Sequence, residues 1–375
     1  MNLVVLGLGK VGLPLASYFG QLGHRVRGFD TNTDLTGRLL AGEKPLPWEN
    51  CSLSDFTTVR ELKTGLQEAD AVYVIVPTPL EHDRLSCRHV LEAIAEVRPQ
   101  WDGPIIVGST IESRDAERVC SDPMIGYSPP LIRLGSVVAD LSTASVVLSG
   151  AWSDLMHETI QAVWKREALR GSPVTIAVAK LAINVSLSMR VAWANELDDV
   201  CKHLGADSSV VLEAVQRDPR IGRGYMTPGW SPSGPCLPRD LVVWTGLSWT
   251  PIAGVVESRH ASRRTRIVSG VLAQLRELRC RRVGIAGLVY NPGALDTTLS
   301  QGVVTALSIR DMGYEVRVYD PAQYYLPDFG SGHELFDYAV TLRDLESWAE
   351  VLVVTTAWPE FAALSTDKPL IDLRR

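Results

Sequence analysis

The chain has 375 residues, enough for two or three domains that each bury a core of their own. Its composition, 46% hydrophobic and 21% charged, is typical of a soluble globular protein. The net charge of −6, without a block of basic residues, argues against a nucleic-acid partner. No uninterrupted apolar run reaches the roughly 18 residues that a membrane span needs, so we expect no membrane association.

The six cysteines are scattered, with no CxxC pair and no metal-ligand spacing, so the sequence predicts neither a disulfide framework nor a metal site. The chain opens on a strand-like segment, residues 1–6, which leaves no room for the charged and apolar parts of a secretion signal. We therefore expect a cytoplasmic protein.

The first 150 residues alternate short β-branched runs with longer helical patterns, as a parallel sheet covered by helices requires. The clearest strands are residues 2–6, 25–29, 71–76 and 105–107. A glycine pattern, GxGxxG, follows the first strand and opens an apolar helical stretch; it consists of Gly7, Gly9 and Gly12, with Lys10 and Val11 in between. Asp30 ends the second strand about 20 residues later.

This combination of strand, glycines, helix and acid predicts a dinucleotide-binding domain over residues 1–150. The glycines allow a tight turn and a close approach to a pyrophosphate, and Asp30 can accept hydrogen bonds from the adenosine ribose. Because a carboxylate there repels a 2′-phosphate, NAD is the expected cofactor rather than NADP.

A helical pattern without proline runs from about Thr175 to Leu204 and is ended by Gly205. Polar residues recur along one face of it at multiples of three or four positions: Lys180, Asn184, Ser188 and Asn195. Apolar residues such as Val178 and Trp193 leave little face for water, so we expect these polar groups to line a site. This helix would be the spine between domains.

From about Arg281 the chain has the pattern of a second α/β unit, with strands at residues 283–286, 316–319 and 351–354 and a helix within residues 299–312. Gly287 and Asp320 faintly repeat the arrangement of Gly7 and Asp30, but the GxGxxG spacing is missing, so a second NAD site is not expected, while a looser nucleotide-binding surface stays open. The α/β fold would therefore comprise a Rossmann-like NAD domain (1–150), a central helical and dimerisation domain (151–265) and a Rossmann-like C-terminal domain (266–375).

Cys236 lies in the run Gly-Pro-Cys-Leu-Pro-Arg-Asp, residues 234–240. A thiolate can add to an aldehyde, and the resulting thiohemiacetal can lose a hydride to NAD and leave a thioester for water to cleave. Taken alone, a free cysteine is more often an apolar filler of the core.

Several segments, in order along nearly the whole chain, resemble the UDP-glucose/GDP-mannose 6-dehydrogenase family. They are residues 7–14, 76–80, 109–110, 180–184, 195–197, 218–222, 234–240, 319–321 and 356–361. Members of that family oxidise the primary alcohol of a nucleotide sugar to a carboxylate in two NAD-dependent steps. The resemblance implies the same reaction here, with the nucleotide bound by the C-terminal domain.

The resemblance also implies roles for individual residues. Cys236 would be the nucleophile, and Lys180 and Asn184 would stabilise the oxyanion that forms on it. Asp240 would orient or deprotonate a water or the reacting hydroxyl. Thr110 would lie near the nicotinamide, in a cofactor site that also includes Pro77 and Thr78.

On the substrate side the resemblance implies Tyr225, Gly234 and Arg239, together with Arg220 reaching in from a neighbouring subunit, so a homodimer is expected. Plainer interpretations stay open: Lys180 could be a buried structural cation, Asp240 a helix cap and Arg220 a member of a surface ion pair.

The chain also departs from the family pattern. The family's Asn-Pro-Glu-Phe-Leu segment, followed by a second glutamate, corresponds to residues 128–135 here, with Pro130 and Leu134 at the two glutamate positions. The resemblance gives the first of these glutamates a part in hydrolysing the thioester. Losing a general base typically slows the step it serves by 10²–10⁴-fold. Family cations are also replaced at Thr227 and within residues 291–300.

Three functions therefore stay open: oxidation to the uronic acid, oxidation by two electrons only or transfer of the thioester to another nucleophile, and non-catalytic binding of NAD or a nucleotide. The sequence does not name the sugar.

Overall fold

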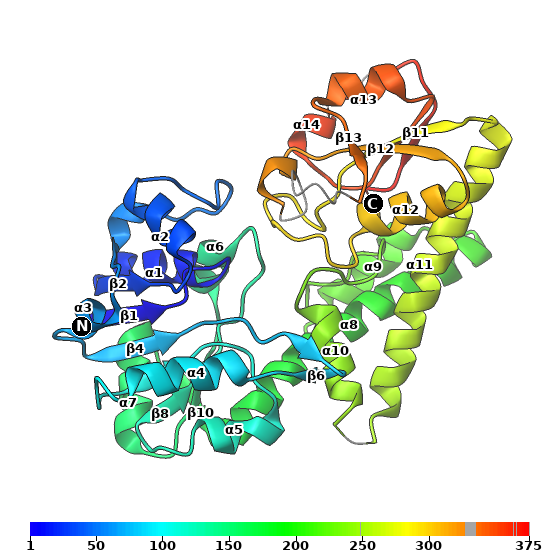
Figure 1. The fold of residues 1–375 in the computed structure, drawn as a ribbon. Helices are drawn as coiled ribbons and strands as arrows, with labels where there is room; N and C mark the ends of the chain where they lie inside the picture. The colour runs from blue at the N-terminus through cyan, green and yellow to red at the C-terminus, as the bar shows by residue number, and fades with distance from the viewer. Residues whose placement is uncertain (248, 327–334, 363, 365, 375) are drawn as a thin grey trace. The chain divides into compact units, whose positions relative to one another are not determined.

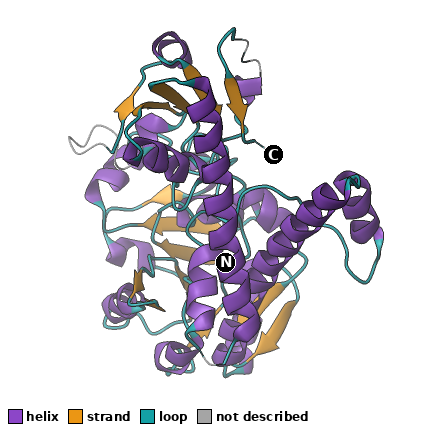
Figure 2. Cartoon of the chain, turned by 90° about the vertical axis from the view of Figure 1, so that its right-hand side faces the viewer, coloured by secondary structure: helices purple, strands orange, loops and turns teal. Residues whose placement is uncertain are grey.

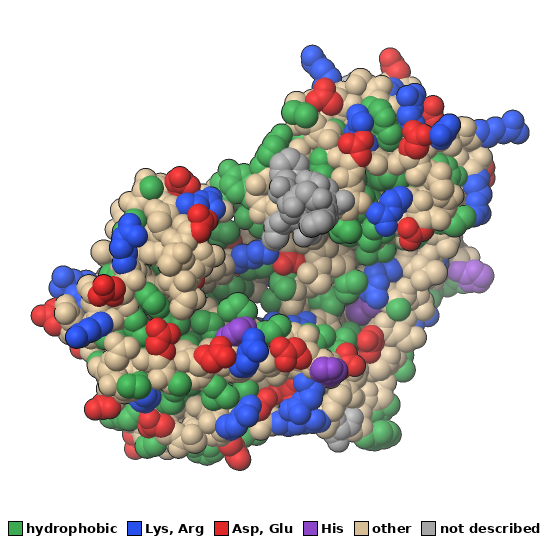
Figure 3. Space-filling view, viewed as in Figure 1, with side chains coloured by type: hydrophobic (Ala, Val, Ile, Leu, Met, Phe, Trp, Pro, Cys, Tyr) green, Lys and Arg blue, Asp and Glu red, His purple; other side chains and the backbone are tan. Residues whose placement is uncertain are grey.

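The computed structural model describes residues 1–247, 249–326, 335–362, 364 and 366–374 (Figure 1). The chain divides into two compact units, Met1–Ala182 and Ile183–Arg375. Acidic and basic side chains are interspersed over the face shown in Figure 3, in keeping with a sequence that has no block of basic residues.

The first unit is built on an eight-stranded sheet with the order β10-β9-β8-β7-β4-β1-β2-β3. Its strands are β1 (Asn2–Leu6), β2 (Arg25–Phe29), β3 (Thr57–Thr58), β4 (Ala71–Val74), β7 (Ile105–Val107), β8 (Ile125–Tyr127), β9 (Val147–Gly150) and β10 (Ala168–Gly171). Neighbouring strands are parallel except for β8 and β9. Every residue of β4 and β7 is buried, as expected for central parallel strands covered on both faces.

The helices of this unit are α1 (Gly12–Gln21), α2 (Thr33–Leu40), α3 (Leu62–Leu66), α4 (Arg88–Val97), α5 (Ser113–Val119), α6 (Val137–Thr143) and α7 (Asp154–Trp164), with a short 3₁₀ turn, η1 (Leu53–Asp55). A two-stranded hairpin, β5 (Leu80–Glu81) and β6 (Arg84–Leu85), follows β4. Trp164 packs against Phe19 and Tyr73, with ring centroids 5.2 and 6.1 Å apart. The unit thus continues beyond residue 150, where the sequence pattern placed the end of the first domain; the three-domain division remains a prediction.

The second unit begins within α8 (Pro173–Leu204) and continues through α9 (Ser208–Arg217), α10 (Leu237–Thr245) and α11 (Pro251–Leu278). The long helices stand out in Figure 2. They lead into a sheet with the order β13-β12-β11-β14-β15, in which all recorded pairings are parallel. Its strands are β11 (Arg282–Ala286), β12 (Glu315–Tyr319), β13 (Asp337–Tyr338), β14 (Val351–Val354) and β15 (Leu370–Asp372), and its helices are α12 (Gln301–Asp311), η2 (Gln323–Tyr325), α13 (Leu342–Trp348) and α14 (Pro359–Ala362).

These elements confirm the α/β fold predicted from the sequence, with a parallel sheet at each end of the chain and a long helix between them. The strands predicted at residues 2–6, 25–29, 105–107 and 351–354 have the predicted bounds, whereas β4 ends at Val74, two residues early. The long helix begins at Pro173, because proline is well tolerated in the first turn.

Helix α8 has its polar residues inside and part of its apolar surface outside. Lys180, Asn184, Ser188 and Asn195 are 7, 6, 0 and 5% exposed, so they are shielded from solvent as the pattern predicted. On another face lies what we call the α8 apolar stripe: Met189, Trp193, Val200 and Leu204, which are 37, 50, 49 and 71% exposed. Among the described helices, α8 alone has the length and average apolarity of a membrane span; because a core helix of a soluble protein passes the same test, this is weak evidence for one.

Candidate active site

The turn between β1 and α1 has the geometry of a pyrophosphate cradle. Gly7 has φ of +99°, and a Cβ on Gly12 would lie 1.9 Å from the Gly7 carbonyl oxygen, so neither position accepts a side chain without rearrangement. No side-chain hydrogen bond caps the N-terminus of α1, which follows Val11, so this helix end can meet an anion, although the Leu13 amide already donates to the Gly9 carbonyl at 3.1 Å. Gly9 and Lys10 complete the turn.

Asp30 lies where a ribose-binding acid is expected, at the end of β2 and only partly buried. Its carboxylate accepts hydrogen bonds from the amides of Leu8, at 2.7 Å, and Asn32, at 2.8 Å. These bonds fix the carboxylate beside the glycine turn. The residues present therefore fit a dinucleotide such as NAD.

Pro77, Thr78 and Thr110 follow β4 and β7, which are neighbours in the sheet, so the structure brings these three predicted cofactor residues to one edge. The two segments are tied together by Ser109, whose hydroxyl accepts from the Val76 amide at 2.8 Å and donates to the Val76 carbonyl at 2.7 Å.

A second tie was not anticipated from the sequence. Glu112, 2% exposed, accepts from the Leu85 amide at 2.6 Å and is 3.5 Å from the Arg84 guanidinium. It thereby anchors the β5–β6 hairpin to the segment that follows Thr110. No motif marks Glu112, because its partners are 27 and 28 residues away.

The segment at the family's glutamate positions is apolar and buried: Pro130 and Leu134 both lie inside. A carboxylate does reach this segment, from Glu49, which is 3% exposed. Its two oxygens accept from the amides of Gly135, at 2.7 Å, and Val137, at 3.1 Å, and burial raises its pKa. Because both oxygens are occupied by backbone donors at the start of α6, Glu49 acts as a cap rather than as a replacement base.

Cys236 is the N-cap residue of α10 and is half-buried. One turn later Asp240 is fully buried at 0% exposure. Asp240 accepts from the Asn184 amide nitrogen at 2.6 Å and from Arg239 Nε at 2.9 Å. Its carboxylate is therefore engaged by side chains rather than by the helix amides, which distinguishes it from a helix cap.

Lys180 belongs to the first unit and lies four residues before Asn184 on α8, so the two side chains share one face of that helix. The structure thus brings Asn184 of α8 together with Arg239 and Asp240 of α10. The role of Lys180 in stabilising the oxyanion rests on the family resemblance.

Side chains from α8 and α11 bind the backbone of the loop that precedes Cys236, residues 229–235, which we call the cysteine loop. The Gly229 amide donates to Asn195 Oδ1 at 2.8 Å, and the Gly229 carbonyl accepts from Arg263 Nε at 2.9 Å. Gly234 has φ of +81°, and a Cβ there would lie 2.8 Å from the ring of Tyr290. The loop therefore accepts only glycine at this position.

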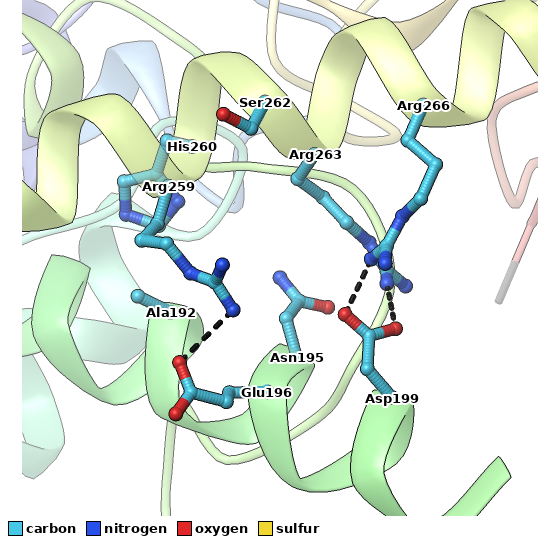
Figure 4. A pocket seen from close by; sticks show the side chains of 9 residues that line it. All are labelled: Ala192, Asn195, Glu196, Asp199, Arg259, His260, Ser262, Arg263 and Arg266. Atoms are coloured by element: carbon cyan, nitrogen blue, oxygen red, sulfur yellow. Dashed lines mark hydrogen bonds and ion pairs between the residues drawn. The ribbon is translucent and has the colours of Figure 1, made fainter. Parts of the chain in front are cut away.

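Asn195 and Arg263 also line a cavity of about 100 Å³ between α8 and α11 (Figure 4). Arg263 and Arg266 both pair with Asp199, at 2.8 and 2.5 Å, and Arg259 pairs with Glu196 at 3.0 Å. These ion pairs fix Arg263, which in turn binds the Gly229 carbonyl of the cysteine loop. Sequence reasoning missed its arginines because single arginines on a helix carry no spacing signal.

Arg220 is almost fully exposed, at 87% of its side chain, and pairs with Asp218 through contacts of 3.0 and 2.6 Å. Tyr225 lies in the same loop with φ of +54°. In the single chain, Arg220 is thus a surface ion-pair member, as the plainer interpretation expected.

The second Rossmann-like turn is closed by its own acid. A Cβ on Gly302 would lie 2.0 Å from the Gly287 carbonyl oxygen, which matches the relation of Gly12 to Gly7. Asp320, however, is buried and accepts from the amides of Leu288, at 2.6 Å, and Val289, at 3.0 Å. Unlike Asp30, this carboxylate is closed to solvent and so to a ribose, which supports the expectation that NAD binds to the first unit alone.

Two family models match the chain. The NAD-binding domain of the UDP-glucose/GDP-mannose dehydrogenase family matches residues 1–167, and the central domain of the same family matches residues 175–248. The UDP-glucose 6-dehydrogenase AglM of Haloferax volcanii is 27% identical over 413 residues, which cover 98% of this chain and 94% of that protein. The UDP-glucose 6-dehydrogenase of Pseudomonas aeruginosa is 26% identical over 403 residues, covering 96% and 88%.

Solved structures agree. A UDP-glucose dehydrogenase from Pyrobaculum islandicum superposes with a TM-score of 0.85 at 27% identity, covering 100% of this chain and 94% of that one. The UDP-N-acetyl-mannosamine dehydrogenase Cap5O from Staphylococcus aureus, at 20% identity and a TM-score of 0.80, covers 100% and 94% and shares the fold. The predicted family and the NAD cofactor are thereby confirmed. The chain belongs to the UDP-glucose/GDP-mannose dehydrogenase family and is an NAD-dependent oxidoreductase of the nucleotide-sugar dehydrogenase type, acting on a CH–OH group.

Proposed function

We propose that this protein oxidises the primary alcohol of a UDP-sugar-like nucleotide sugar to the uronic acid, with Cys236 as the nucleophile of the second oxidation. The observation that carries the proposal is the buried carboxylate of Asp240, one helical turn after Cys236. It is hydrogen-bonded by Arg239 of the same helix and by Asn184 of α8. A buried carboxylate is costly unless it is paired, and here Asn184 and Arg239 supply the hydrogen bonds that the Asp240 carboxylate needs. Such an arrangement beside a half-buried thiol favours a chemical role over simple packing.

When bound, NAD supplies the acceptor for the hydride lost in each oxidation. In the first oxidation the sugar hydroxyl loses its proton to a water that Asp240 orients and that passes the proton to solvent, and an aldehyde forms. The Cys236 thiolate then adds to the aldehyde carbon, and Lys180 and Asn184 hold the resulting oxyanion. Loss of a hydride leaves a thioester. Water then attacks its carbonyl carbon, the C–S bond breaks, and the carboxylate leaves Cys236 as a thiolate again.

The position of Cys236 supports this role in a second way. The thiol precedes the first turn of α10, and the helix N-terminus favours a negative charge at that point. Pro238, near the start of the helix, removes one amide donor without cost to the helix.

A second candidate function follows from Pro130 and Leu134. Both are buried and apolar, and Glu49 is occupied by backbone amides, so the segment offers no carboxylate free to activate water for the thioester. The reaction would then stop after two electrons, or the thioester would pass to a nucleophile other than water.

The test is a screen of UDP-glucose, UDP-N-acetylmannosamine and GDP-mannose with NAD, followed by the product mass and the NADH released per sugar. Two NADH per sugar and a uronic acid support the leading proposal, whereas one NADH or a covalent adduct on Cys236 supports the second. Cys236→Ser should abolish acid formation and leave the first oxidation measurable. Cys280→Ser, another half-buried cysteine, is the matched control. Unchanged acid formation by Cys236→Ser would remove Cys236 from the mechanism.

We further propose that the protein works as a cytoplasmic homodimer in which Arg220 reaches the substrate of the neighbouring subunit. The α8 apolar stripe is an exposed apolar surface that a second copy would cover, and such surfaces commonly mark interaction sites. None of the six cysteines, all of which lie in the described part of the chain, forms a disulfide, which fits a reducing compartment.

A further inference from the structure

We propose that Arg190 is the positioning residue of Arg220: it fixes the loop after α9 so that Arg220 is presented at the dimer surface. The inference rests on the proposed homodimer and on the proposed role of Arg220 in the neighbouring subunit. It adds a residue on α8 that touches neither substrate nor cofactor in the proposed mechanism.

Arg190 binds three carbonyl groups of one short loop. Its Nη1 donates to the Ile221 carbonyl at 3.0 Å, its Nη2 to the Gly222 carbonyl at 2.6 Å and its Nε to the Gly224 carbonyl at 2.8 Å. A guanidinium is a planar fork of donors in fixed directions, so these bonds define the path of the loop and not merely its distance from α8. A lysine ammonium is a point charge and would not impose the same path.

The loop has a backbone that needs such support. Gly222 and Gly224 have φ of +74° and +99°, and Tyr225 has φ of +54°, which is unfavourable for a residue with a side chain. Glycines leave a loop free to take other paths when nothing holds it. The loop is anchored at its far end by Met226, which packs with Ala194 and Leu212. Between that anchor and the end of α9, Arg190 is joined by Arg223, which pairs with Glu213 at 3.2 Å, and by the Asp218 carbonyl, which accepts from the Gly222 amide at 2.9 Å.

The loop bound by Arg190 lies close to exposed apolar residues of α8. Arg190 follows Met189 and precedes Trp193 by three residues, so the loop that it binds runs beside the α8 apolar stripe. Ile221, whose carbonyl binds Arg190, is 45% exposed and adds an apolar side chain to this loop. Arg220 is 87% exposed and its recorded partner is Asp218 of the same loop. A dimer formed through this surface would therefore carry the Arg220 guanidinium towards the other copy.

The experiment is subunit mixing in the full-length protein, with two affinity tags to isolate mixed dimers and UDP-glucose as the first substrate, followed by the other sugars of the screen. Homodimers of Arg190→Ala and Arg220→Ala should each lose about tenfold or more in kcat/KM, mainly through KM for the sugar, while KM for NAD is unchanged. Homodimers of Cys236→Ser form no acid.

In a mixed dimer of Arg190→Ala with Cys236→Ser, one site combines an intact Cys236 with an intact Arg220 loop from the other subunit. Acid formation should therefore recover to about half of the wild-type rate per dimer, and likewise for Arg220→Ala with Cys236→Ser. Arg217→Ala, at the end of α9, is the matched control and should behave as the wild type. Arg190→Lys repeats the test with the charge retained, and we expect it to behave like Arg190→Ala in the mixed dimer even if Arg190→Ala fails to fold.

The outcomes separate the inference from its premise. If Arg220→Ala complements Cys236→Ser while both Arg190 variants do not, Arg190 serves its own subunit and the inference is wrong, although the proposed dimer stands. If Arg220→Ala also fails to complement, the role of Arg220 in the neighbouring subunit is wrong and the inference falls with it. Wild-type kinetics in the Arg190→Ala homodimer would overturn the inference directly.

Discussion

Two aspartates at equivalent places in the two Rossmann-like turns have opposite surroundings. Asp30 accepts from the amides of Leu8, at 2.7 Å, and Asn32, at 2.8 Å, but is partly exposed, so its carboxylate stays within reach of a ligand. Asp320 is fully buried, accepts from the amides of Leu288 and Val289, and has its pKa raised by burial. The same residue type is thus open to a cofactor in one unit and structural in the other.

This contrast gives a prediction with a built-in control. Asp30→Ser should raise KM for NAD by about tenfold, through the lost ribose acceptor, and should narrow the preference for NAD over NADP because the repulsion of a 2′-phosphate is gone. Asp320→Asn should leave both cofactor constants unchanged and lower the free energy of unfolding by about 1–3 kcal/mol, since the NH₂ group that replaces one carboxylate oxygen cannot accept from the backbone amide bound there. Steady-state kinetics with both cofactors and urea denaturation measure these effects. An unchanged cofactor preference in Asp30→Ser would contradict the role given to Asp30.

At the scale of elements, the cysteine loop depends on a contact between α8 and the Gly229 amide. Asn195→Ala removes the acceptor at 2.8 Å from that amide, so we expect a loss of about 1–3 kcal/mol in the free energy of unfolding. The loosened loop should also expose Cys236, which iodoacetamide would then alkylate several-fold faster. Mass spectrometry of the Cys236 peptide over time measures the rate.

Ser188→Ala is the control for this experiment. Ser188 is buried on the same face of α8, but its hydroxyl bonds only to the Asn184 carbonyl of its own helix. Its alkylation rate should match the wild type. Equal rates in Asn195→Ala and Ser188→Ala would show that the Gly229 contact does not hold the loop.

The sequence reveals those elements whose signal is local. Strand β1 is a largely apolar run just before Gly7, β2 comes just before Asp30, and residues 175–204 of α8 form an apolar pattern without proline, so the places of these elements were predictable. Helix α11 was not predicted, because its many arginines obscure the apolar periodicity over its 28 residues.

The same reasoning applies to the site. Cys236 and Asp240 could be named because they share a motif one helical turn long. The supports supplied by Glu49, Glu112 and Arg190 could not be, because each binds backbone amides or carbonyls brought near by the fold alone. Backbone partners leave no residue pattern in the sequence.

At the scale of the whole molecule, stability is coupled to pH through buried histidines in both units. His24 in the first unit has its pKa lowered by burial. His260 in the second unit is 4% exposed, donates from Nε2 to the Ser188 carbonyl at 3.0 Å, and has its pKa lowered by burial from 6.5 to about 4. Both side chains are therefore neutral in the folded protein at a pH where the unfolded chain already binds protons.

The sign of the effect follows from this difference. Well above pH 6.5 neither state binds a proton at His260, so there it contributes no pH dependence. As the pH falls below 6.5, the unfolded state gains a proton that the folded state does not take up until about pH 4, so the free energy of unfolding falls over that interval. At pH 4.5 the loss from His260 should be about 2–3 kcal/mol relative to pH 7.5, from the two pKa values and 1.36 kcal/mol per unit.

His260→Gln should remove that part of the pH dependence, because the glutamine amide can still donate to the Ser188 carbonyl but does not titrate. Urea denaturation followed by tryptophan fluorescence at intervals from pH 7.5 to 4.5 measures the slope for each variant. His203→Gln, an exposed histidine in the last turn of α8, should keep the wild-type slope. If His260→Gln loses as much stability on acidification as His203→Gln does, then His260 is protonated in the folded state and the packing of α11 against α8 tolerates a buried cation.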